Sequence, residues 1–168
     1  MMELLFENRY CYTKELLKEV YRHVFFKTGG MIFFYIISGI AIAQELYFSL
    51  FWDLKFPVYL LLFIPGFYIF RIVQYTQTIK SLLARQQEVS PDKPATVHLS
   101  VYADHLRLIS ASGAEYNLAI SQVKKGFTTA NTVCLITKAK MMYIFPTNCF
   151  TQGTSISFIQ FCQYHHWL

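Results

Sequence analysis

The sequence predicts an α+β membrane protein, in which a two-helix transmembrane hairpin is joined to a small antiparallel β domain closed by a C-terminal helix. Three observations predict this class. Two uncharged apolar runs lie close together in the first half of the chain. Short segments of alternating hydrophobicity then follow, and the chain ends in an apolar helical pattern. Charged residues make up only 15% of the chain, against roughly 25% in an average globular protein.

The two apolar runs, residues 29–43 and 56–70, are each shorter than the about 17–25 residues that a membrane-spanning helix needs. Apolar neighbours extend them to spans of about 29–47 and 55–73, within a predicted hairpin over residues 29–75. Lys27 and Arg71 stand at the ends of the runs, where a cation can reach the headgroups. Pro65-Gly66 lies inside the second span, where we expect a bend.

A cleavable signal peptide is the alternative, because Ala41-Ile42-Ala43 before Gln44 matches a small-x-small cleavage site. The long stretch before the first run contains acids, and a second apolar run follows at once, so we favour the hairpin. Basic residues flank it on both outer sides, which places both termini in the cytoplasm and residues 44–55 outside. These basic residues are Arg9, Lys14, Lys18, Arg22 and Lys27 before the hairpin, and Arg71, Lys80, Arg85 and Lys93 after it.

Residues 1–28 are predicted to form a short strand and an amphipathic helix. The strand covers residues 3–12, and Thr13 is suited to cap a helix that begins at Lys14. Apolar side chains recur at helical spacing along this helix. Residues 76–93 form the exit helix and linker, which Pro91 and Pro94 end.

Residues 94–168 carry the predicted β domain, a meander of six short strands followed by a helix over residues 154–166. The strands are expected near residues 97–101, 105–110, 116–120, 123–129, 132–137 and 141–145. Ala130-Asn131 is expected to form a hairpin turn, and Thr154 is expected to cap the closing helix. Residues 4–9 can add a further strand to an edge of this sheet, which would make the hairpin an insertion.

The order of these elements resembles the YcxB-like family of small bacterial membrane proteins. The resemblance is carried by residues 101–110, by residues 123–126, by the pre-span segment 13–27 and above all by residues 137–161. It implies a pleckstrin-homology-like β domain on the cytoplasmic side of the bacterial inner membrane. The family implies no established activity.

The sequence contains no pattern typical of an active site, so we expect no enzyme, cofactor or metal. It has no G-x-S-x-G, H-E-x-x-H, Walker or G-x-G-x-x-G motif. A zinc site needs more ligands than Cys162, His165 and His166 can supply. We expect these residues to lie in a frayed helix end. Asp104 and His105 are adjacent, and we expect them not to pair because neighbouring strand residues point to opposite faces. The four cysteines are expected to be reduced thiols.

The sequence predicts one basic cluster, which consists of four lysines. A tight turn at residues 130–131 would bring Lys124 and Lys125 near Lys138 and Lys140 at one end of the sheet. Such lysines either bind an anionic surface or discourage pairing between sheet edges. Aromatic residues do not interleave with them, which disfavours nucleic acid.

We therefore expect a non-enzymatic interaction or regulatory module in the membrane, with a protein partner or with self-association. One alternative is an anionic-lipid-responsive module that uses the four lysines. Another is an accessory subunit of a membrane transporter, with Glu45 and Pro65-Gly66 as its features.

Overall fold

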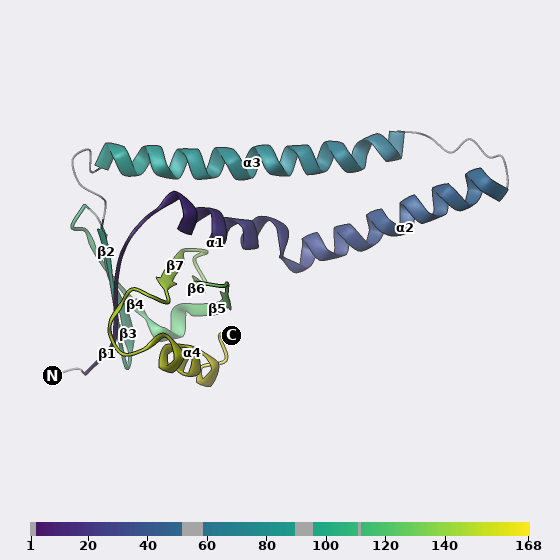
Figure 1. Cartoon of the computed structure of the whole chain (residues 1–168). Coiled ribbons are helices and arrows are strands. Elements are labelled where there is room, and N and C mark those ends of the chain that lie inside the picture. Colours follow the sequence, from purple (N-terminus) through teal and green to yellow (C-terminus); the bar gives the residue numbers. More distant parts are fainter. Residues whose placement is uncertain (1–2, 52–58, 90–95, 111) are drawn as a thin grey trace. The chain divides into compact units, whose positions relative to one another are not determined.

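The structure, a computed structural model, describes residues 3–51, 59–89, 96–110 and 112–168 (Figure 1). The chain divides into two compact units. Met1–Val20 and Leu82–Leu168 form the β unit, and Tyr21–Ser81 form the helical unit. The fold is α+β, with antiparallel sheets and a C-terminal helix. The helices between the first two strands make the helical unit an insertion in the chain order, as predicted.

A five-stranded antiparallel sheet forms one half of the β unit, in the order β4-β3-β2-β1-β8. Its strands are β1 (Leu4–Cys11), β2 (Thr96–Tyr102), β3 (His105–Ile109), β4 (Glu115–Ala119) and β8 (Phe150–Gln152). The sequence places residues 4–9 at an edge of the sheet, and the structure corrects this. The N-terminal strand lies between β2 and β8, because the unpredicted strand β8 covers its outer side.

The remaining three strands form a second sheet in the order β5-β6-β7, so the predicted single meander is wrong. These strands are β5 (Val123–Thr128), β6 (Thr132–Thr137) and β7 (Met142–Pro146). A short 3-10 helix, η1 (Ile120–Gln122), separates β4 from β5. The Ile120 N–H donates to the Asp104 carbonyl at 3.0 Å, so the chain leaves the first sheet at this point.

The two sheets share one hydrophobic core. Every second residue of β2 is buried, which is the pattern of a strand with one face on the core. Strands β6 and β7 are buried almost throughout. The Asn8 side chain on β1 is fully buried and donates to the Pro146 carbonyl on β7 at 2.9 Å. This bond links a strand of one sheet to a strand of the other.

The C-terminal helix α4 (Ser155–Tyr164) closes the core, as predicted. The Thr154 hydroxyl accepts the Ser157 N–H at 3.1 Å and so caps the helix. Phe158 is fully buried, and its ring contacts those of Phe6, Phe145 and Phe150. The helix ends before its predicted limit because the chain turns through a left-handed residue at His166 (φ 56°).

The helical unit takes in the end of α1 (Lys14–Phe26), all of α2 (Gly29–Phe51) and most of α3 (Tyr59–Val89). Helices α2 and α3 meet along an aromatic seam. The Tyr35 and Tyr68 rings stack with centroids 5.5 Å apart, and the Phe34 and Phe67 rings lie 4.2 Å apart. Pro65 lies inside α3, which continues on both sides of it.

Candidate functional site

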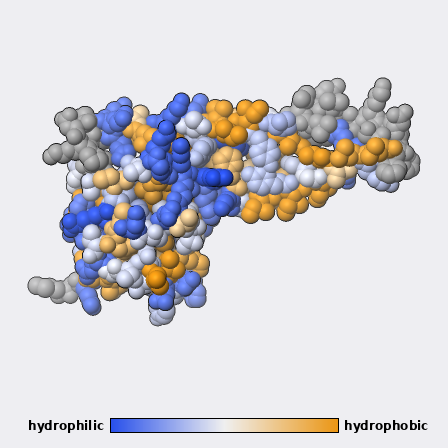
Figure 2. Space-filling view, in the orientation of Figure 1, coloured by the Kyte–Doolittle hydropathy of each residue, from blue (hydrophilic) through white to orange (hydrophobic). Residues whose placement is uncertain are grey.

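The helical unit exposes an extended apolar surface. Residues 29–48 form a helical stretch long and apolar enough to cross a membrane, with a mean hydropathy of 1.6 and only 11% of it buried. Figure 2 shows hydrophobic side chains gathered along α2 and α3. The exposed apolar residues on α2 include Ile32, Phe33, Ile36, Ile37, Ile40 and Leu46, and those on α3 include Ile69, Phe70, Ile72 and Val73.

This stretch is the one candidate span among the described residues. It matches the first predicted span, residues 29–47. The second predicted span, residues 55–73, begins in residues 55–58, which lie outside the described part of the chain. Its remainder belongs to α3. The two-span hairpin therefore stays a prediction.

The four predicted lysines lie at one end of the three-stranded sheet, and we call them the lysine patch (Lys124, Lys125, Lys138 and Lys140). The hairpin turn predicted at residues 130–131 is confirmed, since β5 and β6 pair on either side of it. Lys124 and Lys125 lie at the start of β5, next to a bulge. Lys138 follows β6, where its N–H donates to the Gln122 carbonyl at 2.9 Å. All four side chains are exposed.

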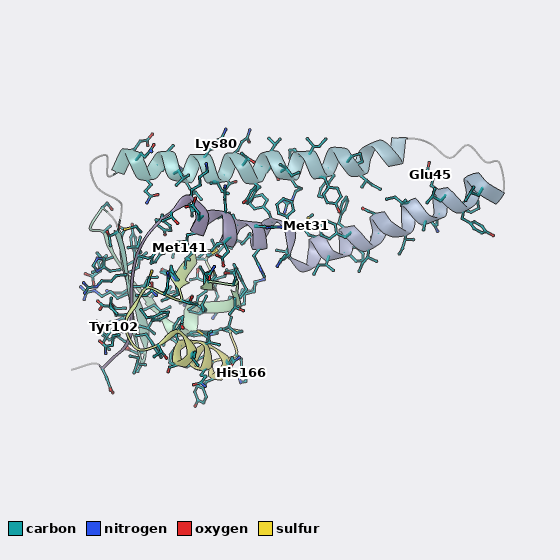
Figure 3. The ribbon with its side chains drawn as sticks, viewed as in Figure 1. Met31, Glu45, Lys80, Tyr102, Met141 and His166 are labelled. Carbon is teal, nitrogen blue, oxygen red and sulfur yellow. The ribbon has the colours of Figure 1, made fainter. Side chains whose placement is uncertain are left out.

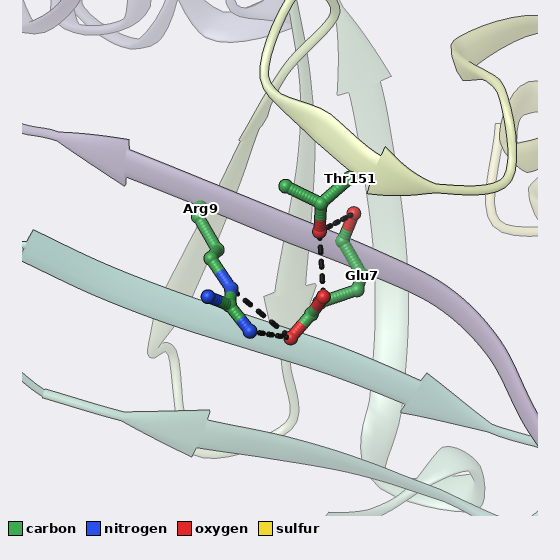
Figure 4. Close-up of polar contacts among 3 residues, drawn as sticks. All are labelled: Glu7, Arg9 and Thr151. Atoms are coloured by element: carbon green, nitrogen blue, oxygen red, sulfur yellow. Dashed lines mark hydrogen bonds and ion pairs between the residues drawn. The ribbon is translucent and has the colours of Figure 1, made fainter.

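Polar side chains on the outer face of the five-stranded sheet pair with one another. Glu7 on β1 accepts two hydrogen bonds from the Arg9 guanidinium, at 2.8 and 3.1 Å, and one from the Thr151 hydroxyl at 2.6 Å (Figure 4). The hydrogen bond from Thr151, followed by that from Arg9, lowers the pKa of the Glu7 carboxyl. This cluster attaches β8 to β1 and needs no ligand to satisfy it.

Asp104 and His105 pair, which corrects the expectation that they could not. Nδ1 of His105 lies 2.7 Å from Oδ1 of Asp104. Asp104 precedes β3 and belongs to the turn, so strand alternation does not govern its direction. The bond to His105 lowers the pKa of the Asp104 carboxyl. The imidazole stacks on the Tyr102 ring at 4.5 Å, so the pair stabilises the β2–β3 hairpin.

The structure separates the residues of the C-terminal Cys-His cluster. Cys162 is fully buried, whereas His166 is exposed at the left-handed turn. The His165 ring stacks on Trp167 at 4.9 Å. Across the described ranges, no group of three or more His, Cys, Asp or Glu side chains is placed to hold a metal ion.

Glu19, on α1, makes a polar contact that sequence reasoning missed. Its carboxylate accepts the Asn131 N–H at 2.8 Å, the Asn131 side-chain amide at 3.2 Å and the Thr129 hydroxyl. Burial raises the pKa of Glu19, but these hydrogen bonds outweigh it and leave the pKa below its ordinary value. No local pattern could reveal this contact, because its partners lie more than a hundred residues away in sequence.

Arg71 is a second side chain whose partners the sequence did not reveal. Its Nη2 donates to the Phe25 carbonyl at 2.9 Å, and its Nη1 donates to Oε1 of Gln74 at 3.4 Å. The guanidinium carbon lies 4.8 Å from the centre of the Phe25 ring. The predicted interfacial cation is therefore held at the C-terminal end of α1, where the helix dipole favours positive charge.

Comparisons with protein families, with curated proteins and with solved structures find no match to this chain.

Proposed function

We propose that the chain is an integral membrane protein in which α2 and the first part of α3 form a two-span hairpin. The exposed apolar surface of residues 29–48, of which only 11% is buried, carries this proposal. Monomeric soluble proteins rarely expose apolar patches larger than a few hundred Å². A bilayer removes such a surface from water, at a gain of roughly 25 cal/mol for each Å².

The charge distribution supports the same arrangement. The sequence has no acidic residue between Glu19 and Glu45, whereas Arg22 and Lys27 precede the candidate span. Arg71, Lys80 and Arg85 follow the apolar part of α3. We infer from the positive-inside rule that both termini face the cytoplasm. On the YcxB-like resemblance, we propose the bacterial inner membrane as the location.

Labelling of cysteines in intact cells tests this topology. All four native cysteines belong to the β unit. Gln44 on α2 and Gln87 on α3 are both exposed, so Gln44→Cys and Gln87→Cys form a matched pair. A membrane-impermeant maleimide should label Gln44→Cys in intact cells and Gln87→Cys only after lysis. Equal labelling of the two variants, or release of the protein by alkaline carbonate, contradicts the two-span hairpin.

In this arrangement the β unit is a pleckstrin-homology-like interaction or regulatory module without enzymatic activity. We expect it to bind a protein segment by strand addition. Strand β4 is an edge of the five-stranded sheet, and its Tyr116 side chain is 52% exposed.

A photo-crosslinking side chain tests this binding mode in cells. A probe at Tyr116 should capture a partner or a second copy of the chain. The control is the same probe at Ile36 on α2, which is also about half exposed and which we expect to face lipid. Capture of the same protein from both positions, or from neither, argues against binding at this edge.

A second candidate function is a response to anionic lipid through the lysine patch. The observation that favours it is the exposure of all four lysines at one end of one sheet. Reversing the charge of these lysines tests this function. The transporter alternative has no comparable support, since Glu45 is half-buried on α2 and α3 continues through Pro65 (Figure 3).

A further inference from the structure

A cavity of about 430 Å³ lies in the helical unit, at the point where the surface of α3 changes from apolar to polar. Ile69 and Phe70, which precede its first α3 residue, are exposed, and so are Ile72 and Val73 between Arg71 and Gln74. The cavity is lined by Phe25 from α1 and by Arg71, Gln74, Gln77, Thr78 and Ser81 from α3. Arg71, Gln74, Thr78 and Ser81 follow one another at three or four residues, so they share one face of α3, and Gln77 lies next to Thr78. In the membrane arrangement proposed above, this face lies at the level of the inner headgroups.

Arg71 carries the only charge among the residues that line this cavity. Two of its N–H groups donate hydrogen bonds, one to the Phe25 carbonyl and one to the Gln74 side chain. Its Nε is buried and has no hydrogen-bond partner among the described residues. A buried donor left unpaired is costly. Because a guanidinium has five N–H groups, the site has donors to spare for an acceptor that the chain does not supply.

No carboxylate is available nearby in sequence to be that acceptor. Residues 20–44 and 59–87 contain no Asp or Glu, but they contain Arg22, Lys27, Arg71, Lys80 and Arg85. The hydroxyls of Thr78 and Ser81 donate to carbonyls of their own helix, at 2.8 and 2.9 Å. The donors that remain are the guanidinium and the side-chain amides of Gln74 and Gln77. This set fits an anion with several oxygen acceptors.

We propose that this cavity binds the phosphate group of an anionic phospholipid headgroup from the inner leaflet. A guanidinium matches the geometry of phosphate oxygens better than an ammonium does. The exposed apolar side chains Ile69 and Phe70 lie just before Arg71 on α3, where acyl chains would pass. The proposal rests on the membrane location proposed above, and it assigns Arg71 a ligand in addition to its contact with α1.

Native mass spectrometry of the full-length protein in detergent tests the proposal, with phosphatidylglycerol and phosphatidylcholine as probes. Arg71→Gln should lower the population of phosphatidylglycerol adducts about tenfold or more, because it removes a charge-assisted bond. Lys80→Gln is the matched control (Figure 3), since Lys80 is exposed on the same helix but does not line the cavity. It should leave the adducts within about twofold of the unchanged protein.

Gln77→Glu is a second variant that keeps the Arg71 contacts intact. Gln77 is exposed, so the variant should fold, and its carboxylate would occupy the anion position. We expect it to abolish the preference for phosphatidylglycerol. Arg71→Lys should retain only part of that preference. If Gln77→Glu binds phosphatidylglycerol as the unchanged protein does, or if Arg71→Gln and Lys80→Gln lose it equally, the proposal is wrong.

Glycerol 1-phosphate in a separate arm distinguishes a lipid from a soluble phosphate. Binding of glycerol 1-phosphate as strong as that of phosphatidylglycerol overturns the lipid assignment. A negative result for lipid binding at Arg71 is also distinct from a negative result for the proposed membrane location. A protein that resists carbonate extraction but shows no Arg71-dependent lipid adduct remains a membrane protein without this site.

Discussion

The carboxylate of Glu19 accepts two hydrogen bonds from Asn131, one from the backbone N–H and one from the side-chain amide. The two residues lie 112 positions apart in the chain. This contact fastens the first half of α1 to the turn between β5 and β6. Within the β unit, this carboxylate adds a polar contact to the burial of Leu17 and Val20 on the same helix.

Replacing Glu19 with Gln should destabilise the β unit by about 1–3 kcal/mol, because it removes a charged acceptor from partly buried donors. The fluorescence of the buried Trp167 during urea unfolding measures this loss. Glu15→Gln is the control, since Glu15 is exposed on the same helix. We expect its effect to stay within about 0.5 kcal/mol. Equal effects of the two variants would show that the contact with Asn131 contributes nothing.

The same carboxylate should make stability depend on pH in a defined direction. The pKa of Glu19 in the folded protein lies below its ordinary value, because hydrogen bonds from Thr129 and Asn131 outweigh the opposing effect of burial. Its contribution is therefore complete above the ordinary glutamate pKa and is lost as pH falls through the folded value. Unfolding curves between neutral and acidic pH should converge for Glu19→Gln and the unchanged protein. A constant gap between them contradicts this assignment.

The β unit should not fold without its N-terminal strand. Strand β1 pairs with both β2 and β8, and it buries Phe6, Asn8 and Tyr10. We expect residues 82–168 alone to lack cooperative unfolding. A chain that joins residues 1–20 to residues 82–168 through a flexible linker should unfold cooperatively. A dispersed amide NMR spectrum from residues 82–168 alone would contradict this prediction.

Gly153→Ala should be strongly destabilising, for two separate reasons. Gly153 has a positive φ of 76°, and a β carbon there would lie 2.5 Å from Cδ1 of Phe6. Gly113→Ala is the matched control, because Gly113 has a similar φ of 81° but nothing within 4 Å of its β carbon. We expect the control to cost about 1 kcal/mol for backbone strain. Gly153→Ala should cost clearly more in the same urea titration, and an equal cost would show that Phe6 moves aside.

Two of the four thiols should resist alkylation in the folded protein. Burial raises the pKa of Cys134 and of Cys162 to about 12, and only the thiolate reacts. Cys11 and Cys149 are half-buried. Mass spectrometry after iodoacetamide treatment at mildly alkaline pH should find Cys11 and Cys149 modified before the other two. In urea all four should react at similar rates. Early modification of Cys134 or Cys162 without urea would show that the core opens.

Charge reversal tests the lysine patch. Lys138→Glu with Lys140→Glu should weaken binding of the linked β unit to anionic vesicles by about thirtyfold or more, at about 1 kcal/mol for each lysine. The control reverses Lys14 and Arg85, which are exposed cations of the same unit outside the patch. Added salt should weaken the binding of the unchanged protein. Equal losses from both double variants would mean that net charge, not the patch, determines binding.

The sequence by itself determined the kind and the order of most elements, with β8 and the short helix η1 as the exceptions. The period-two alternation of Val97, Leu99 and Val101 predicts a strand, and these three side chains are buried on one face of β2. The sequence predicts helix caps at Thr13 and Thr154, and both hydroxyls accept a backbone N–H of the helix that follows. The apolar run at residues 29–43 predicts a span over residues 29–47, and the candidate span of the structure covers residues 29–48. These features are local, because periodicity and capping depend on neighbours within a few residues.

Only the tertiary structure decided which elements pair. It placed β1 inside the sheet, added β8, and divided the predicted meander into two sheets at residues 120–122. It also joined Glu19 to Asn131 and Arg71 to Phe25. Hydrophobic patterns encode how much of a strand or helix is buried, but they do not encode its partner. The partner is selected by the packing of the whole chain, and the candidate sites of this protein depend on such long-range contacts.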